Sequence, residues 1–424
     1  MMRLSRIPLV QPFRSFSTSR APRTAEWTLP AKGTKVYSCM SGGVDSSVAT
    51  KLLQERGYDV KPIFMRNWET LDEQNGSGGC EWERDWADVQ RICRENLGGI
   101  EPELIDLTKE YWQQVFEPAL ESWGKGLTPN PDVTCNQRIK FRALPDRLLS
   151  RDPSAWIATG HYARLVASPL SPSDPALYRA NYLSKDQSHY LSTSPLSSLR
   201  RTIFPLGEFG SKDDVRDLAR KWNMHTKDKK DSMGICFVGV RKGFRSFLDS
   251  YIPPSPGNIV DTEGKVLARH EGLWQYTVGE GARLSGLPEK LFVARKDIER
   301  NALVVVPKHS PLLRCVGIET KDFTFLSPSF PPAQELDTPE GFTCQAQARS
   351  LPMGSLSDCT VRKTSEGKLV IKLESTLMGV SSGQTVALYK GDWCLGGGTI
   401  NSIQTLADEL SNSAAKGRAR AEEV

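Results

Sequence analysis

The seven residues from Ser41 to Ser47, Ser-Gly-Gly-Val-Asp-Ser-Ser, have the composition of a phosphate-binding loop. The glycines let the backbone approach a phosphate closely, and the helix expected to follow supplies free N–H groups and the positive end of its dipole. Asp45 could help to hold Mg²⁺ against the phosphates. The loop is not a Walker A motif, because no lysine stands at the helix start. A strand–helix turn capped by Asp45 or Ser46 is the plainer alternative.

Two further segments contain residues suited to sulfur chemistry. The first, residues 128–136, reads Thr-Pro-Asn-Pro-Asp-Val-Thr-Cys-Asn, and its prolines keep the preceding residues extended. It can therefore present Asp132 and Cys135 at a fixed separation. The second, residues 230–237, ends close to Cys236 a few positions after two lysines, whose charge could lower the pKa of the thiol. Taken alone, each cysteine could equally be a buried core residue.

The surrounding pattern indicates how these segments are positioned. Short apolar segments alternate with helical ones from Lys35 to about Phe237, with strands expected at 35–40, 59–65, 101–106 and 155–161 and helices at 47–56, 83–96, 111–125 and 137–149. This alternation predicts an α/β, Rossmann-like parallel sheet covered on both faces. Ligands of such sheets bind at the carboxyl ends of the strands, where the loop at 41–47 follows the first strand.

The remainder of the chain has a different texture. A cluster of proline and glycine near residues 253–257 is followed by short β-like segments, and the pattern from about 312 to 403 is all-β. We therefore expect an α/β domain at 26–238, a small β-rich domain at 239–308, a C-terminal β-barrel at 309–404 and a disordered tail at 405–424.

The amino terminus has its own signature. Residues 1–24 contain five arginines and four serines and no acidic residue, which is typical of an organellar transit peptide. We expect a transit peptide at 1–25 and a location in the mitochondrial matrix, with a disordered basic start as the alternative. Without these arginines the net charge of +5 falls to about zero, so nucleic-acid binding would need a local basic patch.

Composition excludes several classes of protein. The 424 residues are 38% hydrophobic and 25% charged, which fits a globular protein, and no run of 18 apolar residues predicts a membrane span. The nine cysteines include no Cys-X-X-Cys pair. A disulfide framework and a paired-thiolate zinc site are therefore not expected, and we predict no protein-bound structural metal.

Taken together, the motifs at 41–47, 128–136 and 230–239 resemble those of the bacterial and mitochondrial tRNA-specific 2-thiouridylases, a family of the ATP pyrophosphatase superfamily. Further matching segments occur in the same order at 158–163, 185–190, 204–207 and 391–398. The similarity spans roughly residues 35–402. Residues 279–283 and 345–350 depart from the family pattern, which is more basic there.

The resemblance implies ATP-dependent 2-thiolation of the wobble uridine, or its 5-taurinomethyl derivative, in mitochondrial tRNAs for Lys, Glu and Gln. An oxygen on pyrimidine C2 is a poor leaving group, and adenylation converts it to AMP. Cys236 would carry the incoming sulfur as a persulfide, and Cys135 would release it, with a transient disulfide between them. Asp132 would lie near the base as an acid or base.

The resemblance also assigns binding residues and partners. ATP, with Mg²⁺, would contact Cys39, Met40, Ser41, Gly42, Gly43, Val44, Asp45, Ser46, Met65 and Gly160. The tRNA would contact Asn130, Pro131, Asp132, Lys185, Asp186 and Gln187. A cysteine desulfurase or a persulfide relay protein would supply sulfur to what we expect to be a monomer.

Two other classes of function remain open from the residues. One is another adenylating enzyme that forms C–N bonds, such as an argininosuccinate or GMP synthetase, which needs no cysteine pair. The other is a non-catalytic tRNA-binding protein with a decayed site, against which the intact loop and both cysteines argue. A cytosolic-type tRNA thiolase is a further possibility, although such enzymes carry the Cys-X-X-Cys pairs that this chain lacks.

Overall fold

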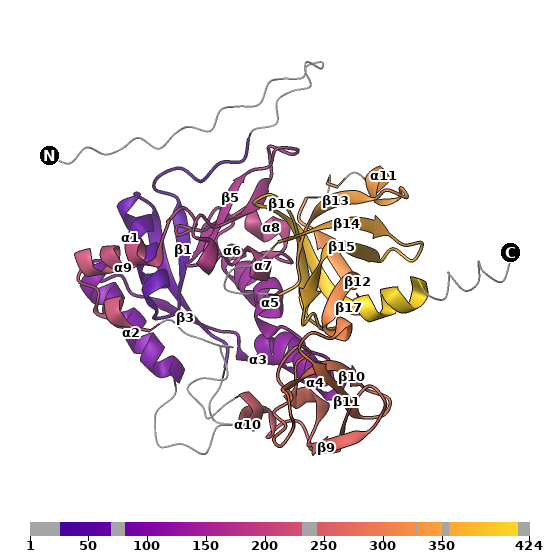
Figure 1. The fold of residues 1–424 in the computed structure, drawn as a ribbon. Coiled ribbons are helices and arrows are strands. Elements are labelled where there is room, and N and C mark those ends of the chain that lie inside the picture. The colour runs from indigo at the N-terminus through magenta and orange to yellow at the C-terminus, as the bar shows by residue number, and fades with distance from the viewer. Residues whose placement is uncertain are drawn as a thin grey trace.

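The computed structural model describes residues 26–68, 81–230, 244–327, 330–331, 333–349 and 356–413. In Figure 1 a parallel sheet with its helices lies at the left, a β-barrel at the right, and a small sheet below them. The predicted transit peptide at 1–25 and the predicted sulfur carrier Cys236 lie outside the described residues.

The first region is a five-stranded parallel sheet in the order β3-β2-β1-β4-β7. Its strands are β1 (Lys35–Met40), β2 (Asp59–Arg66), β3 (Glu103–Asp106), β4 (Trp156–Thr159) and β7 (Thr202–Ile203). Successive side chains of β2 enter different cores: Ile63 and Met65 pack into one cluster and Phe64 into another. This alternation is what a sheet buried on both faces requires, and it confirms the predicted fold class.

Helices cover this sheet. The longest are α1 (Val44–Glu55), α2 (Glu81–Asn96) and α9 (Lys212–Lys221). The predicted helix at 111–125 is observed as α3 (Thr108–Tyr111), η2 (Trp112–Phe116) and α4 (Glu117–Gly124). Shorter helices are η4 (Leu183–Lys185), α7 (Ser188–Leu191), α8 (Leu196–Leu199), η5 (His225–Asp228), α10 (Phe244–Leu248), η6 (Leu273–Gln275), η7 (Pro311–Leu313) and α11 (Ala333–Leu336).

The helix predicted at 137–149 begins earlier and is less regular than expected. It is observed as α5 (Pro131–Cys135), η3 (Asn136–Ala143) and α6 (Leu144–Leu149). The early start follows from a cap on α5, described below. Wide π-helical turns occupy η3, where Phe141 departs from helical geometry with φ −114° and ψ 17°. Such irregularities often occur at functional sites.

The two β regions follow in chain order. The small sheet has the order β10-β11-β8-β9, formed by β8 (Gly257–Val260), β9 (Val266–His270), β10 (Leu291–Asp297) and β11 (Ala302–Pro307). The barrel contains β12 (Arg314–Phe325), β13 (Phe342–Gln347), β14 (Ser357–Lys363), β15 (Leu369–Met378), β16 (Thr385–Lys390) and β17 (Trp393–Thr405). Pairing of β12 with β17 closes it, as the all-β pattern predicts.

A hairpin that the sequence analysis did not predict joins the first region to the barrel. Its strands are β5 (Ala163–Ala167) and β6 (Pro175–Arg179), and residues 168–174 connect them. Strand β6 pairs with β17 through Tyr178 and Leu177 opposite Trp393 and Cys394. The hairpin therefore extends the sheet of the barrel to eight strands, while the parallel sheet of the first region remains separate.

The carboxyl terminus also differs from expectation. Residues 406–413, predicted as part of a disordered tail, are helical. The cause is a reciprocal cap, in which the backbone N–H and hydroxyl of Thr405 donate to the Asp408 carboxylate and the Asp408 N–H donates to the Thr405 hydroxyl. Throughout the described ranges, the structure contains no helix with the length and apolar character of a membrane span.

Candidate active site at the carboxyl edge of the sheet

The phosphate-binding loop connects β1 to α1 in a preorganised conformation. The Ser46 hydroxyl accepts a hydrogen bond from the Ser41 N–H at 3.1 Å, and the Ser47 hydroxyl donates to the Gly43 carbonyl at 2.8 Å. Gly43 occupies the N-cap of α1 without a side-chain cap. The start of this 12-residue helix is therefore a suitable site for an anion.

Two glycines of the site are required by their surroundings. Gly42 has φ +70°, and a Cβ atom there would lie 2.6 Å from the backbone oxygen of Asp85. Gly160 follows β4, and its Cβ atom would lie 2.9 Å from the Ser46 nitrogen. The predicted ATP residue Gly160 therefore packs directly against the loop. Met65 stands near the carboxyl end of β2, where Met40 is level with Phe64.

The loop carboxylate has a cation that the sequence analysis missed. The ammonium group of Lys212, from the first turn of α9, lies 2.5 and 2.6 Å from the two carboxylate oxygens of Asp45. The Tyr162 hydroxyl donates to the same carboxylate at 2.7 Å. Tyr162 lies in a segment that matches the family, but Lys212 was not predicted. Its contact with Asp45 spans 167 residues, and no local pattern links the two.

A second lysine holds the other side of the loop. Lys229 Nζ donates to the Gly42 carbonyl at 3.1 Å and lies 2.7 Å from carboxylate oxygens of both Asp85 and Asp88. Burial alone would raise the pKa of Asp88, but hydrogen bonds from Lys229 and His225 lower it below its usual value. In the sequence, Lys229 is one of the two lysines that precede Cys236, whereas its described contacts tie the loop to α2.

The cysteine segment forms the capped start of a helix. The Asn130 side-chain oxygen accepts from the N–H groups of Asp132 and Val133 at 3.2 and 3.4 Å, and Pro131 occupies the first turn. Asp132 and Cys135 are three residues apart, so they lie on one face of α5. Cys135 is buried. Asn130 and Pro131, predicted to frame the base, thus have a clear local role in shaping this helix.

Cys135 of the cysteine helix packs in the same buried cluster as Cys39 of β1 and Met65 of β2. Burial raises the pKa of Asp132, and burial raises that of Cys39 to about 12, while the charge of Lys140 opposes both shifts. Burial and the same Lys140 charge lower the pKa of His161 to about 3. Lys140 on η3 therefore acts on the end of β1, the turn after β4 and α5 together. The influence of Lys140 was not predicted from the sequence, although its spacing of eight residues from Asp132 places both residues near one helix face.

The predicted tRNA segment at 185–187 has largely internal side-chain contacts. The Asp186 side chain is 4% exposed and accepts from Arg179, from the Ala180 N–H and from Ser188. Gln187 exchanges hydrogen bonds with the Tyr162 backbone at 2.9 Å in both directions. Asp186 and Gln187 thus fix the backbone next to Lys185, whose side chain is half-buried.

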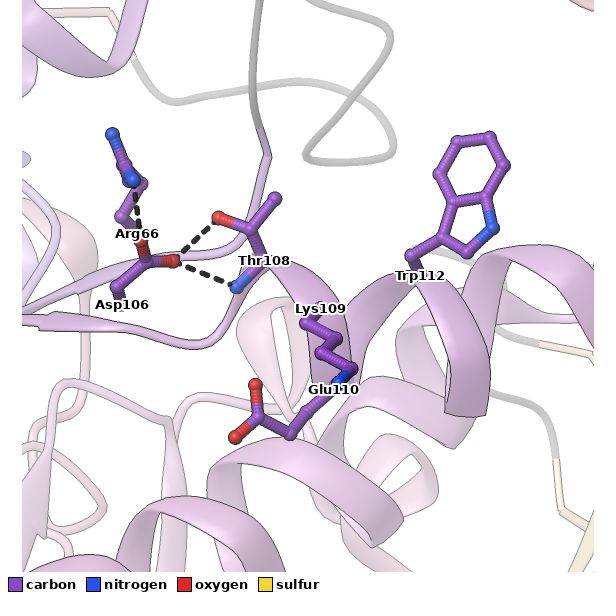
Figure 2. Close-up of a pocket in the computed structure, with 6 residues that line it drawn as sticks. All are labelled: Arg66, Asp106, Thr108, Lys109, Glu110 and Trp112. Carbon is purple, nitrogen blue, oxygen red and sulfur yellow. Dashed lines mark hydrogen bonds and ion pairs between the residues drawn. The ribbon is translucent and has the colours of Figure 1, made fainter.

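The sheet edge also bears an open hollow of about 540 Å³. Its lining residues are Arg66, Asp106, Thr108, Lys109, Glu110 and Trp112 (Figure 2). Arg66 pairs with Asp106, which also accepts from the Thr108 N–H and hydroxyl. Burial favours the protonated carboxyl, but Arg66 and Thr108 lower the pKa of Asp106 to about 2. None of the predicted site residues is among those that line the hollow.

Comparisons with known proteins cover most of the chain. Residues 34–240 match the family model described as "tRNA methyl transferase HUP domain", 245–307 the "tRNA methyl transferase PRC-barrel domain", and 317–400 the "Aminomethyltransferase beta-barrel domain". The tRNA-specific 2-thiouridylase MnmA of Bacillus subtilis is 38% identical over 373 residues, covering 87% of this chain and 95% of its own. The protein of the same name from Marinobacter nauticus is 38% identical over 395 residues, covering 91% and 96%.

A solved structure gives a weaker likeness. The U34-tRNA thiolase NcsA from Methanococcus maripaludis is 18% identical, with a TM-score of 0.30, and the match covers 52% of this chain and 67% of that chain. A likeness at this level carries no further conclusion about the site.

Proposed function

The chain belongs to the tRNA-specific 2-thiouridylase family, and from this premise we propose that it replaces the C2 oxygen of a tRNA uridine with sulfur at the expense of ATP. The observation that supports this most strongly is packing: Cys135 of the cysteine helix lies in a buried cluster against which Cys39, near the end of β1, and Met65, near the end of β2, also pack. This packing supports a single site that the cysteine helix forms with the strand ends beside the phosphate loop.

The first step would be adenylation. The uridine C2 oxygen attacks the α-phosphorus of ATP, an O–P bond forms, and pyrophosphate leaves. The N-terminus of α1 and the Ser41, Ser46 and Ser47 hydroxyls are suited to bind the phosphates. Lys212, through Asp45, and Lys229, through the Gly42 carbonyl, hold the loop from two sides and would keep its N–H groups aligned for the phosphates.

Mg²⁺ would supply charge neutralisation on the phosphates when ATP binds. Asp45 is the acidic residue of the loop, and one carboxylate together with phosphate oxygens and water is a common Mg²⁺ environment. Within the described ranges, no group of three or more His, Cys, Asp or Glu side chains is arranged to hold a metal by itself. The residues thus fit a metal that enters with the nucleotide.

The second step would transfer sulfur. The terminal sulfur of a persulfide on Cys236 attacks C2, and the C2–O bond breaks as AMP leaves with the original oxygen. The Cys135 thiolate then attacks the Cys236 sulfur, which releases the 2-thiouridine and leaves a Cys135–Cys236 disulfide for a thiol reductant to reduce. Burial of Asp132 raises its pKa, which suits a group that exchanges a proton during these steps.

The finer assignments are part of the same proposal. The arginine- and serine-rich residues 1–25 support a transit peptide and action in the mitochondrial matrix. The acceptors would be the wobble uridines of mitochondrial tRNAs for Lys, Glu and Gln, with or without a 5-taurinomethyl group. A cysteine desulfurase or a persulfide relay protein would load Cys236, and the enzyme would act as a monomer.

An isotope experiment tests the chemistry. A tRNA anticodon stem-loop labelled with ¹⁸O at C2 of the wobble uridine is incubated with the enzyme, ATP–Mg²⁺, a protein persulfide donor and a thiol reductant. The proposal predicts equal amounts of 2-thiouridine, AMP and pyrophosphate, with the label in AMP. Label in pyrophosphate or water would contradict adenylation of the base. If AMP forms in the absence of tRNA when an amine substrate is supplied, and the amine becomes part of the product, a C–N-forming enzyme would be favoured.

A further inference from the structure

Thr128, at the start of the cysteine segment, is held by both β regions of the chain. Its N–H donates to the Ser382 carbonyl at 3.0 Å, and its carbonyl accepts from the Gln384 side chain at 3.0 Å. Both partners immediately precede β16 in the barrel. Its hydroxyl accepts from Lys296 Nζ, on β10 of the small sheet, at 3.3 Å. Backbone and side chain of one residue are thus fixed by two separate domains.

The packing around Thr128 is equally close. Gly383 of the barrel has φ +90°, and a Cβ atom there would lie 2.9 Å from the Thr128 nitrogen. On the other side, a Cβ atom on Gly126 would lie 3.4 Å from carbons of both Leu273 and Ile298 in the small-sheet region. Residues 126–128 are therefore enclosed between the barrel and the small sheet.

A lysine at position 296 carries a desolvation cost. Burial lowers the pKa of its ammonium group to about 8, opposed by the charge of Glu280. The Glu280 carboxylate is itself 3.3 Å from Arg245. An apolar side chain of similar length would fill the space without this desolvation cost, so packing alone does not account for a lysine here.

The segment held by this junction leads directly to the chemistry. Two residues after Thr128, Asn130 caps α5, and α5 carries Asp132 and Cys135. Pro129 and Pro131 make the connection stiff, because they fix their own φ angles and restrict the residues before them. A displacement of Thr128 is therefore passed on to α5 rather than absorbed by the loop.

We propose that Lys296 is a positioning residue, which uses the docking of the small β domain on Thr128 to hold α5 and Cys135 in the geometry for sulfur transfer. The proposal rests on the proposed function in naming the reaction, but its structural part concerns the mobility of Cys135 alone. It makes both β domains contributors to catalysis through one residue of the cysteine segment.

The test compares full-length wild type with Lys296→Met, Lys296→Arg and Thr128→Val. Lys290→Met is the matched control, since Lys290 is exposed and immediately precedes β10. The rate of Cys135 alkylation by iodoacetamide is followed by mass spectrometry of its peptide. Thiolation turnover, KM for ATP and for tRNA, and Tm are measured for the same proteins.

Loosening the junction should expose the buried thiol more often. Lys296→Met and Thr128→Val should therefore alkylate Cys135 about three- to tenfold faster, the factor that one hydrogen bond contributes. Their thiolation kcat should fall about tenfold or more through misplacement of the cysteine, with both KM values and Tm close to wild type. Lys296→Arg should restore much of both rates, and Lys290→Met should match wild type.

Two results would overturn the proposal. An unchanged Cys135 alkylation rate with a raised, salt-dependent KM for tRNA would make Lys296 a phosphate contact instead. Equal losses in every parameter together with a lower Tm would make it an ordinary structural residue. If wild type thiolates no tRNA, the proposed function fails, but the alkylation rates still decide whether Lys296 restrains Cys135.

Discussion

Replacing Gly160 by alanine should weaken ATP binding through steric displacement of the phosphate loop. The added Cβ atom would lie 2.9 Å from the Ser46 nitrogen and 3.1 Å from the Asp45 carbonyl carbon. Ordinary contacts of this kind begin at about 3.4 Å, so the first turn of α1 must retreat by about 0.5 Å. Both neighbours are backbone atoms at the end of a buried strand and the start of a helix, which leaves no flexible side chain to move aside.

The expected magnitude follows from this geometry. Overpacking of a well-packed site costs about 1–3 kcal/mol, and each 1.4 kcal/mol is a factor of ten in affinity. We therefore expect the Kd for ATP to rise about tenfold, with a Tm lower by a few degrees. The N–H groups at the start of α1 would no longer be aligned with the phosphates.

The assay is calorimetric titration with ATP–Mg²⁺, with thermal unfolding measured in parallel. Gly124→Ala is the matched control, because it adds the same methyl group in α4 where nothing lies within 4 Å. It should bind ATP like wild type. Equal ATP affinity and Tm in the two variants would refute the close packing of Gly160 on the loop.

Three further predictions follow from the charges of the site and its surroundings. Asp132→Asn should leave ATP affinity unchanged and lower the thiolation rate about 10²-fold. Because burial raises the pKa of Asp132, the wild-type pH–rate profile should have an acidic limb above the usual Asp range, and the variant should lack it. Persistence of the limb in the variant would contradict a proton-transfer role for Asp132. Lys212→Met should lower stability by about 1–3 kcal/mol in urea titrations, because it removes the cation of a half-buried Asp45 carboxylate, and adding Asp45→Asn should recover part of the loss. Burial lowers the pKa of His189 to about 4, so the unfolded chain binds a proton below about 6.5 while the folded chain does not. The free energy of unfolding should thus fall by up to about 1.4 kcal/mol per unit as pH drops from 6.5 to 4, and an undiminished slope in His189→Gln would show that another group is responsible.

The sequence predicted the parts of the fold that depend on local pattern. The strand at 35–40, the glycine-rich loop after it and the all-β carboxyl-terminal region were predictable because strand periodicity and breaker residues are local. The hairpin from β5 to β6 was not, because much of its support comes from pairing with β17, more than 200 residues later. The helix at 406–413 was missed although Thr405 and Asp408 form a readable cap.

The site shows the same division between local and distant information. The loop glycines were predictable from a short string, whereas the Asn130 cap was missed and the helix was predicted to start too late. Lys212 and Lys296 were not predictable, because their contacts with Asp45 and Thr128 bridge about 170 residues and depend on how helices and domains pack. The internal role of the Asp186 carboxylate was hidden for the same reason, since a conspicuous polar string does not reveal which of its side chains are buried.

The most direct test of the central claim is formation of 2-thiouridine at a defined tRNA position. Mitochondrial tRNA, ATP–Mg²⁺ and a protein persulfide donor are incubated with wild type, Cys135→Ser or Cys236→Ser, and digested tRNA is read by mass spectrometry. The account predicts one 2-thiouridine at the wobble position with wild type and none with either variant. A folded, ATP-binding wild type that forms no 2-thiouridine, or a Cys135→Ser variant as active as wild type, would contradict it.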